Sequence, residues 1–193
     1  MDAPFIFSKP VSGRNFICRK ADCDRLAGAI TEGRSVVLIE APRSGKTSLL
    51  RQTLQNMLSR RMRVSSTEVS LLNIRSLEAL CAALAGSLLR SIATTPSEFE
   101  DAGRRLLTGT HLRFDPEAYS ARDAVVVPDG EVTVEDLVAV LSIPGKITAQ
   151  GESRVVIIRE FQNILLLDGA DAVMKAVSEA VSRRGRASFV LSG

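Results

Sequence analysis

The segment that most constrains this chain is a short apolar run followed by a compact loop and an apolar pattern of helical period. It reads Val36-Val37-Leu38-Ile39-Glu40-Ala41-Pro42-Arg43-Ser44-Gly45-Lys46-Thr47-Ser48-Leu49-Leu50. The β-branched run predicts a buried strand, and the order strand, loop, helix is that of the phosphate-binding pattern G-x-x-x-x-G-K-[ST]. Backbone N–H groups of such a loop and the N-terminus of its helix attract polyphosphate. The segment therefore predicts a nucleotide-binding loop.

The pattern assigns roles to several side chains of this loop. Lys46 would reach the β- and γ-phosphates, and the Thr47 hydroxyl would hold Mg²⁺. The other predicted nucleotide contacts come from the same stretch: Pro42, Arg43, Ser44, Gly45 and Ser48. For Arg43, a solvated loop arginine is the alternative interpretation.

One position departs from the pattern. Glu40 stands five residues before Gly45, where glycine is expected. Glycine serves there because the loop needs unusual dihedral angles and a close approach to phosphate. A glutamate pointing inward would add a charge of the ligand's own sign. Alternatively it faces away at the end of the strand, with Ala41 as the small residue.

Composition sets the class of protein. The 193 residues, of which 45% are hydrophobic and 24% charged, suit one globular domain with a hydrophobic core. Tryptophan is absent and aromatic residues make up only 4%, which argues against base-stacking platforms for single-stranded nucleic acid. The net charge of +3 is mild. Two arginine clusters, 60–63 and 183–186, could contact nucleic acid, although cations that complement helix ends are the alternative.

The remaining composition signals are negative. Cys18, Cys23 and Cys81 are too few for a disulfide framework, and with His111 as the single histidine no zinc site is expected. No apolar run reaches the roughly 18 residues of a membrane span. The N-terminus lacks the pattern of a signal peptide. A cytoplasmic protein without membrane partners is the expectation.

Strands and helices alternate along the chain. Residues 1–34 are expected to form an arm and a helix from Lys20 to Thr31, and residues 35–193 the core. Further helices are expected at 46–60, 77–92, 97–107, 133–141 and 170–183, the last capped by Asp168 or Asp171. Strands are expected at 36–39, at 63–69 on a sheet edge, and at 155–158 and 187–191 inside the sheet. Residues 94–131, rich in proline and glycine, are expected to be a variable surface insertion. Alternation of this kind predicts a parallel sheet covered by helices on both faces.

A second motif follows the apolar run at 155–158. Such a loop needs an acidic residue at the end of another buried strand, and the candidate segment is Arg159-Glu160-Phe161-Gln162-Asn163. With this segment the chain resembles the AAA+ and STAND-related P-loop ATPases of archaea and bacteria, a branch whose members also resemble origin-recognition ATPases. The matching motifs are Asn15-Phe16-Ile17-Cys18-Arg19 (N-F-x-x-R), Ala41 to Leu49 (A-P-R-x-x-G-K-T-S-L, one residue shorter here), Ile157 to Asn163 (hhhh-[DE]-E-F-Q-N) and Val190 to Gly193 (a small polar sensor).

The resemblance implies a function. Glu160 would polarise the attacking water as a catalytic residue together with Lys46, and Ser192 would sense the γ-phosphate. ATP with Mg²⁺ would be bound and hydrolysed to ADP and phosphate, driving a conformational switch. Gln162 and Asn163 would be polar contacts near the site or caps of the turn, and Phe161 would pack in the core.

A second departure accompanies the first. Arg159 occupies the position of the family's first acid, which accepts a hydrogen bond from the loop threonine and supports Mg²⁺. A cation there inverts the local charge. Because one strand would separate the ends of the two strands, about 10 Å apart, we hypothesise that Arg159 pairs with Glu40.

The resemblance implies a three-layer P-loop NTPase fold with a mostly parallel sheet. Family members continue beyond the sensor strand into a further strand and a helical lid, so we expect this chain to lack the lid, as a fragment or truncated gene would. We also expect the 36–39 strand to be an open sheet edge. Three functions remain open: an ATPase, a catalytically weak nucleotide-binding or interaction module, and a DNA-associated regulator. A homo-oligomer or a protein partner is compatible with each.

Overall fold

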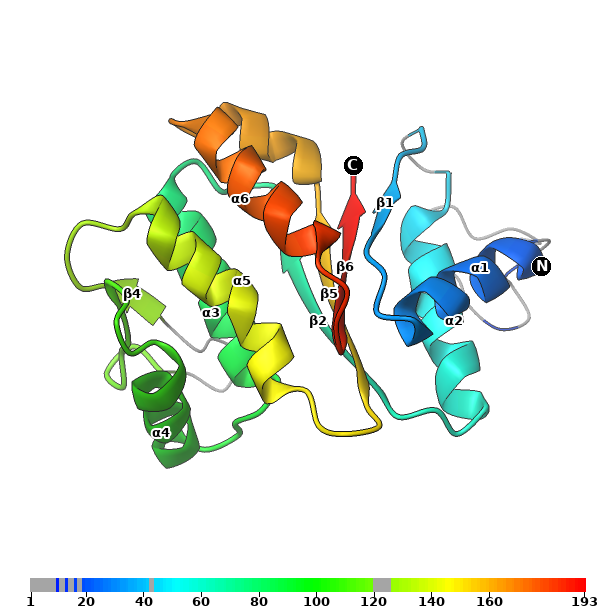
Figure 1. The fold of residues 1–193 in the computed structure, drawn as a ribbon, viewed down its shortest axis with the longest axis horizontal. Coiled ribbons are helices and arrows are strands. Elements are labelled where there is room, and N and C mark those ends of the chain that lie inside the picture. The colour runs from blue at the N-terminus through cyan, green and yellow to red at the C-terminus, as the bar shows by residue number, and fades with distance from the viewer. Residues whose placement is uncertain (1–9, 11–12, 14–15, 17–18, 42–43, 120–125) are drawn as a thin grey trace, which may run out of the picture.

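The centre of the molecule is a parallel sheet. A computed structural model describes residues 10, 13, 16, 19–41, 44–119 and 126–193. Four strands pair in the order β1-β6-β5-β2 (Figure 1), and all three pairings are parallel. The strands are β1 (Val36–Leu38), β2 (Val64–Ser70), β5 (Ser153–Arg159) and β6 (Ala187–Ser192). The expected parallel sheet is confirmed.

Helices cover both faces of this sheet. They are α1 (Lys20–Thr31), α2 (Lys46–Ser59), α3 (Leu77–Arg90), α5 (Val134–Ile147) and α6 (Ala170–Ser182). Side chains of β5 alternate between two apolar clusters: Val155 and Ile157 pack with α1 and α2, whereas Val156 and Ile158 pack with α3, α5 and α6. This alternation follows from the two-residue period of a strand. The result is the expected three-layer α/β architecture.

Residues 94–131 contain more structure than the sequence predicts. The expected short helix is α4 (Pro96–Leu106), which starts with a capping box formed by Thr95 and Glu98. Beyond it, β3 (Leu112–Phe114) and β4 (Val126–Pro128) form an antiparallel pair. Phe99 of α4 stacks on Phe114 of β3 with ring centroids 5.5 Å apart. Alternating buried side chains on three-residue strands carry too little periodicity to be found in a glycine- and proline-rich sequence.

The strand β1 is not buried as its apolar run predicts. It lies at the edge of the sheet beside β6, and the side chains of Val37 and Ile39 are 56% and 82% exposed. An apolar run alone cannot reveal whether a helix covers each face of a strand. The prediction of an open edge at this strand and that of an edge position for β2 are both confirmed.

Helix starts agree with the sequence in part. Ser76 accepts a hydrogen bond from the Ala79 N–H at the start of α3, as expected. The start of α6 differs, because Gly169 with φ +69° occupies the N-cap and no side chain caps it. The predicted caps Asp168 and Asp171 are therefore wrong, and both carboxylates are exposed. No helix in the described ranges is long and apolar enough to cross a membrane.

Candidate nucleotide-binding site

Four residues form a lateral row at the carboxyl edge of the sheet. Leu38 of β1 is in register with Ser192 of β6, Ser192 with Arg159 of β5, and Arg159 with Ser70 of β2. The predicted loop follows β1, and Glu160 follows β5. Because these strands are parallel, both motifs lie at the edge where ligands of open α/β sheets bind. In Figure 1 this is the end of β6 marked C.

The side chain of Glu40 faces α1 rather than the loop interior. The Arg19 guanidinium donates to both carboxylate oxygens of Glu40. It also donates to Asp22 Oδ2 at 2.9 Å and to the Ser44 carbonyl at 3.4 Å. The hydrogen bonds from Arg19, and then from Ser44, hold the pKa of Glu40 at about 2. The carboxylate is thus an anchor that ties the loop to the N-terminal helix.

The backbone of Glu40 does not need glycine. Among the described residues other than glycine, only Arg61 and Glu160 have a positive φ. The expected dihedral strain at Glu40 is therefore absent, and its charge is paired with Arg19 rather than left unpaired beside the loop. A sequence pattern could not reveal how the Glu40 side chain is placed, because its placement depends on Arg19, which lies 21 residues earlier in the chain.

The loop leads into α2 through a glycine that is needed for its conformation. Gly45 has φ +94° at the N-cap of α2, and a Cβ there would meet no atom within 4 Å. Lys46, the first residue of α2, donates through Nζ to the carbonyls of Glu40 at 2.7 Å and Ala41 at 3.2 Å. The lysine is thus folded back over its own loop. The N-terminus of this 14-residue helix supplies the positive end of a dipole at the same place.

The other predicted loop residues lie around this point. Ser44 is exposed, Thr47 is half-buried in the first turn of α2, and Ser48 is buried. The predicted contacts Pro42 and Arg43 lie outside the described residues.

Glu160 is held by a neighbouring strand. Its backbone adopts the left-handed conformation, with φ +52°, at the junction of β5 and the 3₁₀ helix η2 (Phe161–Leu166). Ser70 Oγ at the end of β2 donates to Glu160 Oε2 at 2.7 Å. Because β2 lies on the side of β5 away from β1, this bond draws the carboxylate away from the loop. Asn163 caps the same region by donating to the Leu71 carbonyl at 3.1 Å, one of the two roles expected for it.

The hypothesis that Arg159 pairs with Glu40 is wrong. Arg159 Nε lies 2.7 Å from Glu68 Oε1 on β2, at ion-pair distance but without hydrogen-bond geometry. Glu68 is closer because it is only two residues from Ser70, the register partner of Arg159, whereas β6 separates Arg159 from β1. The two departures from the family pattern are thus neutralised separately, Glu40 by Arg19 and Arg159 by Glu68.

The last predicted residues lie beside this row. Ser192 is buried, with 6% of its surface exposed, between β1 and β5. The Gly193 N–H donates to the Leu38 carbonyl at 3.3 Å. Gln162 is close to the same end, because a Cβ on Gly193 would lie 2.9 Å from Gln162 Oε1. Phe161 is half-buried against the larger apolar cluster, as expected.

No protein-only metal cage is present in the described part of the chain. No three Asp, Glu, His or Cys side chains gather closely enough to bind an ion. The single histidine, His111, has Nδ1 3.0 Å from Asp136 Oδ2 and a side chain that is 52% exposed.

Sequence reasoning missed two residues of this site. Arg19 stood inside the N-F-x-x-R motif but had no assigned role, and Ser70 ends a strand considered only as an edge. Both act on a carboxylate far away in sequence, 21 residues for Arg19 and 90 for Ser70. The available signal was only that a small polar residue ends β2, because its register with the residue before Glu160 is known from the structure alone.

Comparisons with known proteins bear on the fold. No family model and no curated protein matches the sequence. The ORC1 protein of Aeropyrum pernix, solved in complex with DNA, is similar with a TM-score of 0.54 and 12% identity, over 92% of this chain and 39% of that protein. A Walker-type ATPase of Pyrococcus abyssi has a TM-score of 0.49 and 16% identity, over 96% of this chain and 48% of its own. The ORC2 protein of A. pernix, in ADPNP–ADP complexes, has a TM-score of 0.48 and 17% identity, over 97% of this chain and 44% of that protein.

The chain thus spans less than half the length of each of these three proteins. The likeness to ORC1 concerns the fold. Together with the strand order and the position of the loop, it confirms the expected architecture: the chain has a P-loop NTPase fold with a parallel central sheet.

Proposed function

We propose that the chain binds ATP at the loop 40–47 and hydrolyses it with Glu160. The observation that carries the proposal is the position of Lys46. It starts a 14-residue helix directly after a left-handed glycine, at the same sheet edge as Glu160. Preference for ATP over GTP rests on the family resemblance alone.

The side chains of the chain have distinct parts in this proposal. Lys46 releases the carbonyls of Glu40 and Ala41 and donates to phosphate oxygens, and Thr47 holds Mg²⁺, which neutralises charge on the phosphates when bound. Once the Glu160 carboxylate has left Ser70 Oγ, it accepts a proton from the attacking water. Ser192, in register between Leu38 and Arg159, donates to the transferred phosphate.

Calorimetric binding of ATP, with and without Mg²⁺, tests the nucleotide site. We expect binding that Mg²⁺ strengthens, and its loss in Lys46→Ala. Lys175→Ala is the matched control, because Lys175 is exposed on α6. Equal binding by the native chain and Lys46→Ala would refute the assignment of the loop. Phosphate release by the native chain and by Glu160→Gln then tests hydrolysis.

A catalytically weak binding module is the second candidate. It is favoured by Arg159, which stands at the acidic position and is committed to Glu68, and by Ser70, which holds Glu160. ATP binding without measurable phosphate release in both the native chain and Ser70→Ala would support it over the ATPase.

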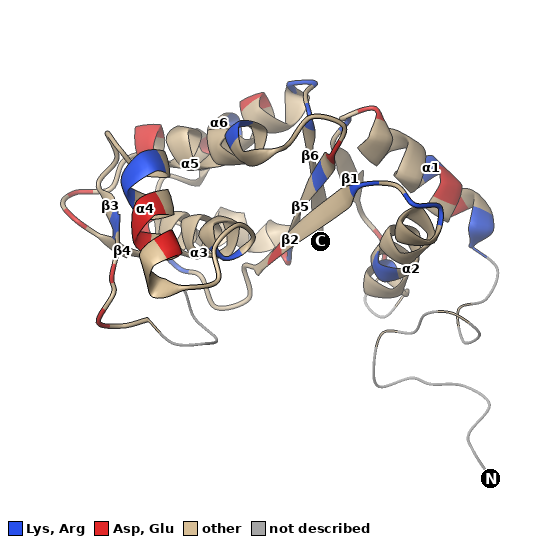
Figure 2. Ribbon diagram, turned by 90° about the horizontal axis from the view of Figure 1, so that it is seen from below, with Lys and Arg blue, Asp and Glu red and all other residues tan. Residues whose placement is uncertain are grey.

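A DNA-associated regulator is the third candidate. The Ser153 N–H donates to the Arg63 carbonyl at 2.8 Å and the Arg154 N–H to the Arg186 carbonyl at 3.2 Å, which brings the two arginine clusters to one edge. Figure 2 looks onto this edge, with the basic segments before β2 and after α6 on the same side. DNA binding would fall steeply with salt, because phosphate contacts release counterions. Retention on DNA that is unchanged in Arg61→Ala/Arg63→Ala would contradict this candidate.

A further inference from the structure

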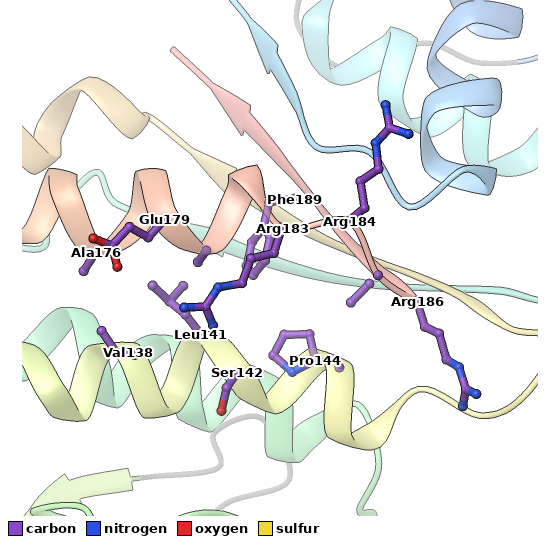
Figure 3. A pocket seen from close by; sticks show the side chains of 14 residues that line it. Val138, Leu141, Ser142, Pro144, Ala176, Glu179, Arg183, Arg184, Arg186 and Phe189 are labelled. Carbon is purple, nitrogen blue, oxygen red and sulfur yellow. The ribbon is translucent and has the colours of Figure 1, made fainter.

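A groove between α5 and α6 lies away from the nucleotide site. It encloses a cavity of about 200 Å³ near the ends of both helices (Figure 3). Its apolar wall comprises Val138, Leu141, Pro144, Ala176, Ala180 and Phe189. The cavity is large enough for one or two aliphatic side chains, and an apolar wall of this kind favours such an occupant.

Three arginines lie at the end of this groove that follows α6, and one of them, Arg183, turns its guanidinium toward α5. Arg183, Arg184 and Arg186 line it, all three are exposed, and none forms an ion pair with the described residues. In Figure 3 the guanidinium of Arg183 extends toward α5, whereas Arg184 and Arg186 extend outward on other sides. Only one acid, Glu179, is among the lining residues. The groove therefore fits an occupant that combines aliphatic side chains with carboxylates.

The other end of α6 presents that combination. Leu165 and Leu166 of η2 are 65% and 59% exposed, which is unusual for adjacent leucines. Asp168 and Asp171 follow, both exposed, and neither caps α6 nor forms an ion pair within the described ranges. We call residues 165–171 the acidic leucine segment.

We propose that copies of this chain associate head to tail, with the acidic leucine segment of one copy bound in the α5–α6 groove of the next. The leucines enter the cavity, and the two aspartates meet the arginines. Two grooves cannot face each other, because their arginines would repel. The acidic leucine segment precedes and begins α6, whereas the groove is lined by α6 from Ala176 onward, so each copy offers two different surfaces. A contact that joins the segment of one copy to the groove of the next is heterologous and continues from copy to copy, whereas a two-fold pair that exchanged both contacts would stop at dimers.

The proposal does not depend on nucleotide binding. The groove lies beside the start of β6, at the edge of the sheet opposite the loop and Glu160. The experiments are therefore made without nucleotide, and failure of the proposed ATPase function would leave them unaffected.

Sedimentation velocity of three proteins over a concentration series tests the association. The native chain is expected to form species larger than dimers, less so at high salt because the aspartate–arginine contacts are screened. A groove variant, Arg183→Glu/Arg186→Glu, and a segment variant, Asp168→Lys/Asp171→Lys, should each self-associate at least about tenfold more weakly. Arg104→Glu/Arg105→Glu on α4 is the matched control and should associate like the native chain. Circular dichroism checks that each variant is folded.

Mixing the two variants gives the decisive result. In the mixture the Asp-bearing segment of the groove variant meets the Arg-bearing groove of the segment variant, and the Lys-bearing segment meets the Glu-bearing groove. Both contacts are complementary, so the mixture should regain species larger than dimers, in which the two variants alternate. Chains carrying all four substitutions pair a Glu-bearing groove with a Lys-bearing segment and should regain larger species as well. A native chain that forms nothing larger than dimers up to about 1 mM would overturn the proposal, as would a mixture that does not regain larger species.

Discussion

The guanidinium of Arg19 binds both carboxylate oxygens of Glu40 and joins the N-cap of α1 to the loop that follows β1. Such paired, charge-assisted hydrogen bonds are stronger than single neutral ones. The residue that breaks the glycine pattern thus has a structural role that a glycine could not perform. It also keeps a negative charge out of the loop interior.

Glu40→Gln should destabilise the chain by about 1–2 kcal/mol at pH 7, because it replaces a charged acceptor at a partly buried site. The pKa of Glu40 is lowered from 4.5 to about 2 in the folded chain, so its contribution is complete above pH 4.5 and is lost as the pH falls toward 2. Urea unfolding at pH 7 and pH 3 should show a smaller difference between the two proteins at pH 3. Glu32→Gln, whose pair with Arg34 is exposed, is the control and should differ by less than about 0.5 kcal/mol. A difference that does not depend on pH would contradict this role.

The hydroxyl of Ser70 controls the direction of the proposed catalytic carboxylate. Removing it in Ser70→Ala frees Glu160 from a bond typically worth about 1.5–3 kcal/mol for a charged acceptor. We expect phosphate release to rise severalfold while ATP affinity is unchanged, because Ser70 does not lie on the loop. Ser66→Ala, an exposed serine of the same strand, is the control. A rate that falls in Ser70→Ala would show that the serine supports the active orientation instead.

At the scale of elements, the turn before β1 packs against the turn before β6. A Cβ on Gly33, which has φ +64°, would lie 1.8 Å from the Gly185 carbonyl oxygen. This close contact of two backbones sets how α1 and β1 approach the remainder of the sheet. The contact is possible only because a hydrogen occupies the place of a side chain.

Gly33→Ala should therefore lower the free energy of unfolding by about 3 kcal/mol or more, since steric overlap with the backbone of Gly185 adds to the dihedral penalty. Gly109→Ala separates the two effects, because Gly109 has φ +78° but a Cβ there would meet nothing within 4 Å. We expect Gly109→Ala to lower the free energy of unfolding by about 1 kcal/mol. Thermal or urea unfolding measures both variants. Equal costs would show that the turn moves aside without penalty.

Elements with strong local signals could be predicted from the sequence, whereas contacts between elements could not. The helix Lys20–Thr31 matches the expected bounds, and Gly45-Lys46 opens α2 as the loop pattern requires, because these features depend on neighbours in sequence. The exposure of β1 and the β3–β4 pair depend on what covers a strand. Only the folded chain determines that covering.

The same division holds for the candidate site. The positions of Lys46 and Glu160 at one edge follow from the parallel topology, which the alternation of elements indicates. The partners of Arg159 and Glu160 depend on strand register, since Ser70 and Glu68 are two residues apart on β2. A sequence without an aligned partner strand does not contain this register.

At the scale of the whole molecule, the protection of backbone amides against hydrogen exchange should decrease from the centre of the sheet to the β1 edge. β5 and β6 have strands on both sides and apolar clusters on both faces, whereas β1 has one neighbour and exposed Val37 and Ile39. Opening of β1 exposes less apolar surface than opening of β5, so it requires less free energy. Hydrogen–deuterium exchange should therefore be at least about tenfold slower in 155–158 than in 36–38, since tenfold corresponds to about 1.4 kcal/mol.

Addition of ATP and Mg²⁺ tests how the site is coupled to this edge. Binding at the loop should slow exchange at 44–50 and at 36–38, because the loop joins the end of β1 to the start of α2 and the nucleotide must dissociate before either segment opens. Residues 126–147, which include β4 and α5 in the helix layer on the other face of the sheet from α1 and α2, should exchange as before and serve as the internal control. In Lys46→Ala the slowing should disappear at both segments while the ratio between β5 and β1 remains. Slowing confined to 126–147 would instead place the nucleotide on the far layer of helices and refute the site at the carboxyl edge.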